Sequence, residues 1–273
     1  MSDIISFLSG KTATSLSPLG RPYLAAVGAL ADRFLVIGNG TSANTIESFN
    51  LSYVRTVLLS SQTYNLVAAT SNRLFLGKKT GTDGTLSVDM TDLSGGYISS
   101  FDTRGIGSSG GHHLIQTIKS LTSDGTYVYV HGTGDWTYGG GSLVQIVHKY
   151  DLTGAFIAEY GFNDDVMEIA VYGGNLYCYS SDNKISARDF SGTIAYQITA
   201  ADSNGTVSIS AIAVNSDGIY VAYPVTGPYQ GILCYDLTFS LKQTYKSALI
   251  SSSPGTTHTK LMAQPNLLVV VYA

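Results

Sequence analysis

The sequence has few charged residues, and this scarcity limits what the chain can be. Of its 273 residues, only 12% are Asp, Glu, Lys or Arg, against roughly 25% in a typical globular domain. The 15 basic residues are scattered, with only Lys78 and Lys79 adjacent. A nucleic-acid-binding protein should show a basic stripe, so we expect no nucleic-acid partner.

The sequence also lacks a membrane span and a secretory leader. No apolar run approaches the ~18 residues that a membrane helix needs, so we expect no membrane insertion. Residues 1–7 have neither a basic start nor a long apolar stretch, unlike a signal peptide. We therefore expect a cytoplasmic or virion-associated protein.

Cysteine is scarce as well. Cys178 and Cys234 each lie inside an apolar strand pattern. Free cysteine packs as a small hydrophobe, and nothing in the sequence indicates the oxidising compartment that a disulfide needs. We expect two buried free thiols.

The chain is instead rich in residues that suit β-sheets joined by tight turns. Apolar residues make up 44%, and the sequence has 30 glycines and 19 tyrosines. One motif recurs: an apolar strand, then Asp, Leu or Phe, Ser or Thr, Gly, and a second strand. Asp or Asn first and Gly last match hairpin turn chemistry. Full copies cover residues 92–95, 151–154 and 189–192; weaker copies begin at Asn50 and Asp236, and a sixth covers residues 7–10.

A second hairpin precedes each motif, with turns such as residues 123–125 and 216–218. Each repeat is thus a four-stranded meander with strands A to D, and the period of about 40–50 residues is typical of propeller blades. The step from the last copy through the chain end to the first falls in the same range. A two-sheet sandwich, the alternative, would not explain why complementary half-repeats stand at the two ends.

The sequence therefore predicts an all-β fold, a single six-bladed β-propeller of four-stranded antiparallel blades spanning residues 1–273. N-terminal strands C and D (residues 4–16) should pair with C-terminal strands A and B (residues 259–272), which closes the ring and removes open sheet edges. The expected blades cover residues 23–60, 64–101, 114–160, 165–199, 206–247, and 258–273 plus 4–17.

The blade ending Leu233-Cys234-Tyr235-Asp236-Leu237-Thr238 resembles the broad propeller superfamily of the YVTN and NHL type. This resemblance covers the whole chain and implies architecture, not function. The Trp-Asp ending of WD40 blades is missing, because Trp136 is the only tryptophan, and so is the Asp box of sialidases.

The two faces of such a propeller are expected to differ. A–B and C–D turns share one face and are nearly all short; we call it the short-turn face. B–C and D–A loops share the other, the loop-rich face, where binding residues tend to lie. Its predicted loops cover residues 38–44, 78–85, 102–113, 131–141, 201–205, 226–230 and 251–258.

The blade at residues 114–160 carries the most elaborate loops, so we place the candidate binding site there. Exposed aromatic side chains with Asp and His nearby suit a sugar or a protein surface. Alternatively, Trp136 packs over its own loop. The candidate binding residues are Trp136, Tyr138, Asp135, His112 and Tyr229.

No catalytic, metal or cofactor motif survives inspection. Gly105-x-Gly107-x-x-Gly110 matches the dinucleotide pattern but leads into a strand rather than a helix. The adjacent His112 and His113 would point to opposite sides of a strand. No Gly-x-Ser-x-Gly elbow is present. We expect no cofactor.

Acidic residues enter only one of the expected inner strands. Asp164, Asp165 and Glu168 belong to it, whereas other blades offer Asn65, Gln116, Ser210 and Lys260 at equivalent positions. A calcium cage of the lactonase type therefore looks incomplete, and we interpret the three acids as polar channel lining.

Three functions remain open. The composition is similar to that of phage structural proteins, which favours a non-enzymatic binding or assembly module: a virion- or tail-associated structural or receptor-binding propeller. Its partners would be other virion or assembly proteins, or a host surface protein or glycan. The alternatives are a carbohydrate-binding lectin and a six-bladed metal-dependent hydrolase.

Overall fold

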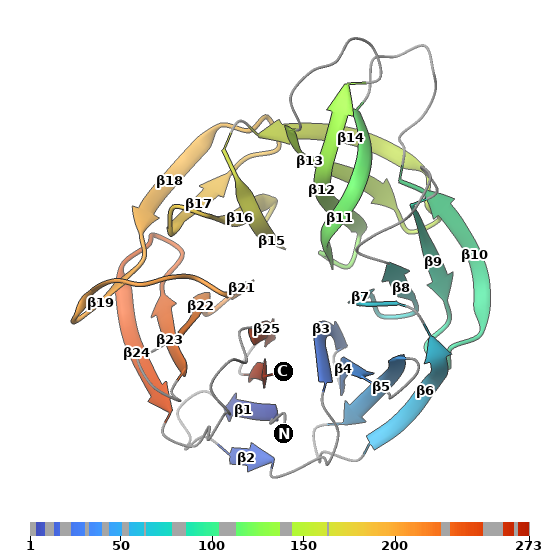
Figure 1. Ribbon diagram of the computed structural model, residues 1–273, viewed down its shortest axis with the longest axis horizontal. Coiled ribbons are helices and arrows are strands. Elements are labelled where there is room, and N and C mark those ends of the chain that lie inside the picture. Colours follow the sequence, from blue (N-terminus) through green and yellow to red (C-terminus); the bar gives the residue numbers. More distant parts are fainter. Residues whose placement is uncertain are drawn as a thin grey trace.

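The fold is known from a computed structural model of the chain. The structure describes residues 4–8, 14–16, 23–30, 33–39, 44–50, 55–62, 64–77, 86–103, 113–136, 144–162, 164–224, 230–247, 259–264 and 267–272. Within these ranges the regular elements are all β-strands, arranged around a central axis (Figure 1).

Four sheets are antiparallel meanders of four consecutive strands whose side chains are largely described. They are blades in which the first strand is innermost and the last is outermost (Figure 1). Their strands are β7 (Leu66–Ala69), β8 (Leu74–Gly77), β9 (Ser87–Thr91) and β10 (Tyr97–Asp102); β11 (His113–Ser123), β12 (Tyr127–Trp136), β13 (Val144–Asp151) and β14 (Phe156–Phe162); β15 (Val166–Tyr172), β16 (Asn175–Ser180), β17 (Lys184–Arg188) and β18 (Ile194–Thr199); β21 (Ala211–Asn215), β22 (Gly218–Pro224), β23 (Gln230–Tyr235) and β24 (Leu241–Ser247).

Two further four-stranded sheets are defined mainly by their strand pairing. One has the order β3-β4-β5-β6, and the other, the terminal sheet, has the order β2-β1-β26-β25. The strands are β3 (Tyr23–Leu30), β4 (Arg33–Asn39), β5 (Asn44–Asn50) and β6 (Arg55–Gln62); β1 (Ile4–Leu8), β2 (Thr14–Leu16), β25 (Thr259–Gln264) and β26 (Leu267–Tyr272). A short hairpin of β19 (Ala201–Asp202) and β20 (Gly205–Thr206) follows β18.

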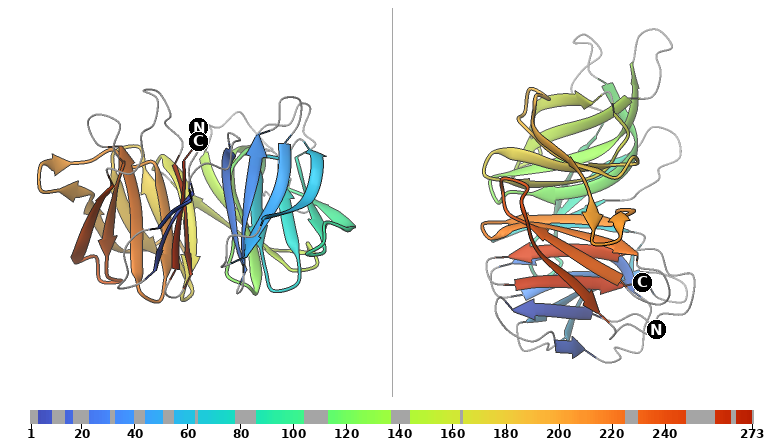
Figure 2. Two further views of the ribbon diagram at one scale, coloured as in Figure 1. Left: turned by 90° about the horizontal axis from the view of Figure 1, so that it is seen from below. Right: turned by 90° about the vertical axis from the view of Figure 1, so that its left-hand side faces the viewer.

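The terminal sheet joins the two ends of the chain. β1 runs antiparallel to β26, with Ile4 opposite Val271 and Leu8 opposite Leu267. The ends consequently lie close together (Figures 1 and 2). The innermost strands of neighbouring sheets contact one another in the order β3, β7, β11, β15, β21 and β25, and β25 also contacts β3.

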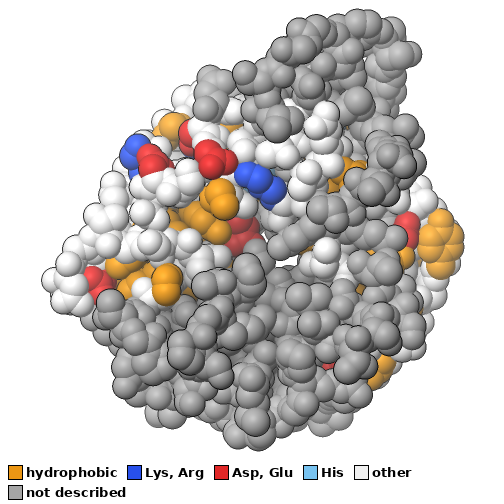
Figure 3. Space-filling model, in the orientation of Figure 1, with side chains coloured by type: hydrophobic (Ala, Val, Ile, Leu, Met, Phe, Trp, Pro, Cys, Tyr) orange, Lys and Arg blue, Asp and Glu red, His pale blue; other side chains and the backbone are white. Residues whose placement is uncertain are grey.

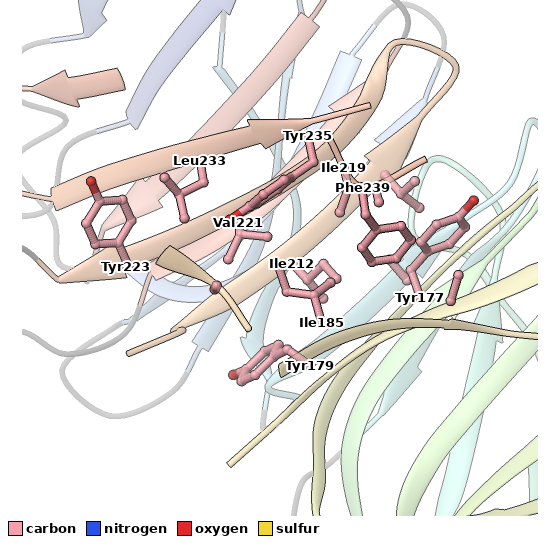
Figure 4. Packing of buried hydrophobic residues seen from close by; sticks show 14 of the residues in the cluster. Tyr177, Tyr179, Ile185, Ile212, Ile219, Val221, Tyr223, Leu233, Tyr235 and Phe239 are labelled. Atoms are coloured by element: carbon pink, nitrogen blue, oxygen red, sulfur yellow. The ribbon is translucent and has the colours of Figure 1, made fainter. Parts of the chain in front are cut away.

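The chain is thus an all-β propeller of four-stranded antiparallel blades. The described part of its core lies between neighbouring sheets, in four clusters of buried hydrophobic side chains. Between the β15–β18 and β21–β24 blades, β-branched and tyrosine side chains interlock (Figure 4). There the rings of Tyr177 and Phe239 stack with centroids 6.4 Å apart. Such side chains fit the pleated, buried surface of a strand.

The recurring Asp motif forms the same turn in each described blade. The Asp carboxylate accepts the hydroxyl and the amide of the residue two positions on, and the amide four positions on. In the turn that starts at Asp151, these are Thr153 Oγ1 at 2.7 Å, Thr153 N at 2.8 Å and Ala155 N at 2.9 Å. The same three bonds form at Asp92, Asp189 and Asp236. The predicted hairpin turns are therefore confirmed at these four positions.

The fourth residue of this turn has a positive φ, which is why glycine recurs there. Gly95, Gly154 and Gly192 have φ between 85° and 92°. The exception is Phe239, with φ 66°. It is a buried non-glycine residue whose ring stacks on Tyr177 and Tyr196 of the preceding blade. Aromatic packing between blades therefore offsets the strain of the backbone at this turn.

Two of the predicted loops differ from the structure. The loop expected at residues 131–141 begins later, because β12 continues to Trp136 and pairs with both β11 and β13. The extension is stabilised by the buried His131, whose Nδ1 lies 3.2 Å from Ser120 Oγ. Glycine is required at position 132, since a Cβ there would lie 2.2 Å from Thr117 O. Residues 201–205 were also expected to form a plain loop. They instead belong to the hairpin of β19 and β20.

Both cysteines are buried free thiols, as predicted. Cys178 lies in β16, and burial raises the pKa of its thiol to about 12. Cys234 lies in β23, and burial raises the pKa of its thiol as well. Neither thiol is activated as a nucleophile, because that requires a lowered pKa.

Candidate functional site

The candidate site lies where β11, β13 and the start of β15 meet, at the inner edge of the loop-rich face. Lys119 projects from β11, and Gln145 lies one residue inside β13. Asp164 and Asp165 precede β15, at the point where a D–A connection enters the inner strand. Four polar residues from two blades thereby come together. Figure 3 shows acidic and basic side chains adjoining one another beside the hollow at the centre of this face.

Asp165 is the point at which the two blades meet. Its Oδ1 accepts Gln145 Nε2 at 3.0 Å and lies 3.3 Å from Lys119 Nζ. The ammonium also donates to the carbonyl of Val166 at 3.2 Å. The Asp165 side chain is 54% exposed, and Gln145 Oε1 is buried with no hydrogen-bond partner among the described residues. The junction therefore exposes one carboxylate, that of Asp165, whereas the Gln145 acceptor is shielded from solvent.

Asp164 is held by a buried cation. The Arg188 guanidinium, from β17, makes two bonds to it, of which the one from Nη1 to Oδ1 is 2.8 Å long. Arg188 is 3% exposed. Its Nε donates to Ser186 Oγ at 3.0 Å, and its planar head lies 5.0 Å from the ring centroid of Phe162. A paired, hydrogen-bonded and stacked guanidinium of this kind positions its carboxylate rather than leaving it mobile.

Glu168 lies deeper, on β15, and is almost fully buried. Its Oε2 accepts the amide of Ile212, 3.3 Å away on the innermost strand of the next blade. Nearby, the Tyr179 hydroxyl donates to the carbonyl of Ser210 at 3.2 Å. Burial, with the Glu168 charge, raises the pKa of Tyr179. Both side chains tie the β15–β18 blade to the β21–β24 blade.

The acids interpreted as channel lining thus divide into different roles. Asp165, the most exposed of the three, joins two blades through Gln145 and Lys119; Asp164 pairs with Arg188 of its own blade; and buried Glu168 accepts an amide of the next blade. Within the part of the chain that the structure describes, no group of three or more His, Cys, Asp and Glu side chains could hold a metal ion. That same part contains no helix long and apolar enough to cross a membrane.

The structure places the predicted binding residues only in part. Asp135 and Trp136 end β12, opposite Leu114 and His113 of β11. They lie just past Gly134, whose strand partner Val144 precedes Gln145. Their backbones therefore extend from the same edge of the blade as the candidate site, and their side chains fall outside the description. His112, Tyr138 and Tyr229 lie outside the described residues, so their role stays a prediction.

Sequence reasoning missed three residues of this site: Lys119, Gln145 and Arg188. Arg188 carries no clear signal either, because the strand Lys184–Arg188 also contains Lys184 and Ser186 and so does not mark Arg188 as buried. Lys119 and Gln145 lie far from Asp165 in sequence and gave no signal.

The short-turn face uses its polar groups differently. Hydrogen bonds from Ser94, Thr153, Ser191 and Thr238 are the largest cause that lowers the pKa of Asp92, Asp151, Asp189 and Asp236 respectively. These carboxylates are exposed, yet each has one oxygen engaged by its own turn. The recurring Asp is consequently a structural residue.

Comparison with known proteins identifies the fold alone. No family model matches the chain, and no curated protein matches its sequence. Among solved structures it is similar to the WD40 β-propeller domain of Doa1, with 16% identity and a TM-score of 0.53 over 97% of this chain and 96% of that chain. It is also similar to a chain of the nidogen/laminin complex (10% identity, TM-score 0.55, 90% and 93% covered). A chain of the mitotic checkpoint complex gives 12% identity and a TM-score of 0.52, with 95% and 80% covered.

Proposed function

We propose that this chain is a non-enzymatic module that binds a protein partner through its loop-rich face, at the junction of the β11–β14 and β15–β18 blades. The observation that carries the proposal is the Asp165 contact. A half-exposed carboxylate joins residues from two blades at the inner edge of the face on which the long connections lie. Groups that are fixed in place before binding lose less freedom when a partner docks.

The comparisons support a protein partner in a limited way. Two of the similar chains come from structures of protein complexes, the mitotic checkpoint complex and the nidogen/laminin complex. Those complexes are properties of those proteins, and propellers host many unrelated functions. No comparison supports the narrower predictions of a virion protein, a lectin or a lactonase-like hydrolase, and the proposal does not include them.

We also propose that the six sheets are six blades closed into one ring by the terminal sheet. The pairing of β1 with β26 supports this, as does the contact of β25 with both β21 and β3. Deletion of residues 1–16 should expose the edge of β26 and apolar surface, and so cause aggregation. A soluble deletion variant with a cooperative melting transition would contradict closure.

The binding proposal is tested by site-specific photo-crosslinking. A photoreactive amino acid at position 165 should crosslink the partner in cells, and the same residue at position 217, in a tight turn of the short-turn face, should not. The reverse pattern would overturn the assignment. Once the partner is identified, Lys119→Glu with Asp165→Lys should weaken its binding about tenfold or more, while Asp217→Ala leaves binding unchanged.

The aromatic prediction is tested with the same partner. Trp136→Ala should weaken binding by about 2 kcal/mol, as large aromatic anchors commonly do, with little change in melting temperature. If Trp136→Ala instead lowers the melting temperature strongly and binding per folded molecule stays normal, Trp136 packs its own blade and is not a contact residue.

A further inference from the structure

An aromatic cage lies between the β11–β14 and β15–β18 blades, near the short-turn face. Three rings surround the Lys149 ammonium: Nζ is 3.7 Å from the ring centroid of Tyr127, 5.1 Å from that of Phe190 and 5.9 Å from that of Tyr129. All three distances lie within the ~6 Å range of cation–π attraction. The cage is therefore chemically suited to a cation.

The strand register explains how the cage is built. Tyr129 lies directly opposite Lys149, and Tyr127 is two residues along the same strand, so these three side chains share one face of the sheet. Phe190 approaches from the turn of the neighbouring blade and stacks on Tyr129, with centroids 5.5 Å apart and an interplanar angle of 12°. Tyr160 also packs against Phe190, with ring centroids 5.0 Å apart.

Both key residues depart from the repeat. In the β11–β14 blade, the residue two positions before the recurring Asp is Lys149. In the other described blades it is Met90, Ala187 or Cys234, each buried and apolar. In the β15–β18 blade, the residue after the recurring Asp is Phe190. In the other described blades it is Leu93, Leu152 or Leu237. Residues that the fold requires recur from blade to blade. Because Lys149 and Phe190 both depart from the repeat and lie at the same junction between blades, we infer that they serve a function other than folding.

The cage fits a larger cation than the one it holds. The ammonium presses against Tyr127 and stays 1.4 to 2.2 Å farther from the other two ring centres. Among the described residues, the Lys149 ammonium has no hydrogen bond or ion pair in addition to these ring contacts. A primary ammonium is strongly hydrated, whereas a quaternary ammonium loses its water easily and touches several rings at once, as in aromatic cages for choline and methyl-lysine.

We propose that this cage, formed by Tyr127, Tyr129 and Phe190, binds a quaternary ammonium group, and that Lys149 fills it when no ligand is present. Tyr127, Phe190 and Lys149 are partly exposed, so a ligand can reach the cage when the lysine swings out to solvent. Tyr129 is fully buried, with its hydroxyl 2.8 Å from Asp124 Oδ2, and forms the fixed rear wall. This site is separate from the proposed partner site and does not depend on it.

The proposal is tested by titrating the protein with tetramethylammonium chloride, with sodium chloride at equal concentration as the ionic-strength control. Ring proton shifts of the tyrosines, measured by NMR, should saturate near about 1 mM. If the lysine leaves the cage empty about a tenth of the time, Lys149→Ala should bind about tenfold more tightly. Adding Tyr127→Ala to Lys149→Ala should abolish binding. Lys119→Ala, on the loop-rich face, should behave as the wild type.

Each other outcome overturns the proposal. If Lys149→Ala melts cooperatively and does not bind tetramethylammonium, the rings do not form a site. If only Lys149→Ala binds, the lysine seals the cage permanently and the native protein has no site there. Should Lys149→Ala fail to fold, Lys149→Gln, which removes the charge and shortens the side chain by one atom, replaces it in the comparison. Separate titrations with choline and Nε-trimethyl-lysine then show which source of the ammonium group is preferred.

Discussion

On the short-turn face, each of the four Asp turns holds its carboxylate with groups no more than four residues away, and the pattern is nearly identical from blade to blade. On the loop-rich face, Asp164 and Asp165 find their partners on other strands, and Asp165 finds them on another blade. The first face is fixed by local sequence. The Asp165 contact of the second exists only once two neighbouring blades have assembled.

This difference indicates where change can be tolerated. A repeated local turn contributes to stability wherever it occurs, whereas a non-repeated contact between blades can be altered at one junction alone. Binding specificity is therefore expected on the loop-rich face. The Lys149 cage is the exception, because it interrupts the repeat on the face that is otherwise regular.

Arg188→Ala is the variant expected to damage the molecule most. It removes a buried cation that bonds Asp164 and Ser186 and stacks on Phe162. Because Asp164 is partly exposed and can regain water, we expect a loss of about 3 kcal/mol in the free energy of unfolding, the lower end for a broken buried pair. Urea denaturation measures it. Lys242→Ala, which removes an exposed bond to the carbonyl of Asp217, is the control, and an equal loss there would contradict the assignment.

A pair of glycine variants separates the local and the interblade costs of the short-turn face. Gly154→Ala places a Cβ at φ 86° and 2.7 Å from Phe101 of the preceding blade, whereas Gly125→Ala, at φ 87°, meets nothing within 4 Å. We expect losses of about 2–3 and about 1 kcal/mol respectively, measured by urea denaturation. Equal losses would mean that the turn at Gly154 does not pack against its neighbour.

Acid titration should reveal the carboxylates of the short-turn face. Asp92, Asp151, Asp189 and Asp236 have folded pKa values below the ordinary 3.8. Their stabilising contribution is therefore complete above that pH and is lost as the pH falls through the lowered folded pKa values. In Asp189→Asn, the free energy of unfolding should fall less steeply with acid than in the wild type. An unchanged slope would show that the turn does not stabilise the charged form.

Lys119→Ala should have the smallest effect on stability. Its partner Asp165 is 54% exposed, and exposed ion pairs contribute about 0.5 kcal/mol or less. Urea denaturation of Lys119→Ala and Asp165→Asn should give midpoints within error of the wild type. A loss as large as that of Arg188→Ala would mean that the junction is a structural element and would remove the main argument for a binding site there.

Much of the blade architecture could be predicted from the sequence, because its determinants are local. The Asp turns need only an Asp, a hydroxyl and a residue that accepts positive φ within five positions. The turn at Asp236 shows the limit of that rule, since Phe239 stands where glycine was expected and is held by Tyr177 and Tyr196 from another blade. No window around residue 239 contains that information.

The candidate site was harder to predict for the same physical reason. Asp165 was interpreted only as channel lining, and its partners Lys119 and Gln145 are 46 and 20 residues away. Strand register decides which of many polar residues come close, and register depends on bulges such as those between Ile115 and Thr117 and between Ile118 and Ser120 in β11. The continuation of β12 to Trp136 was missed because glycines at positions 132 and 134 suggested a loop.

The pairing of β1 with β26 also determines when, during synthesis, β1 can pair along both of its edges. Because one of the two partners of β1 occupies residues 267–272, residues 4–8 leave the ribosome on the order of tens of seconds before that partner exists, at elongation rates of about 5–20 residues per second. During that interval the apolar strand Ile4–Leu8 is an open edge. The strand Ile4–Leu8 is thus among the last to acquire both of its neighbours, and until then its free edge is open to pairing with other chains.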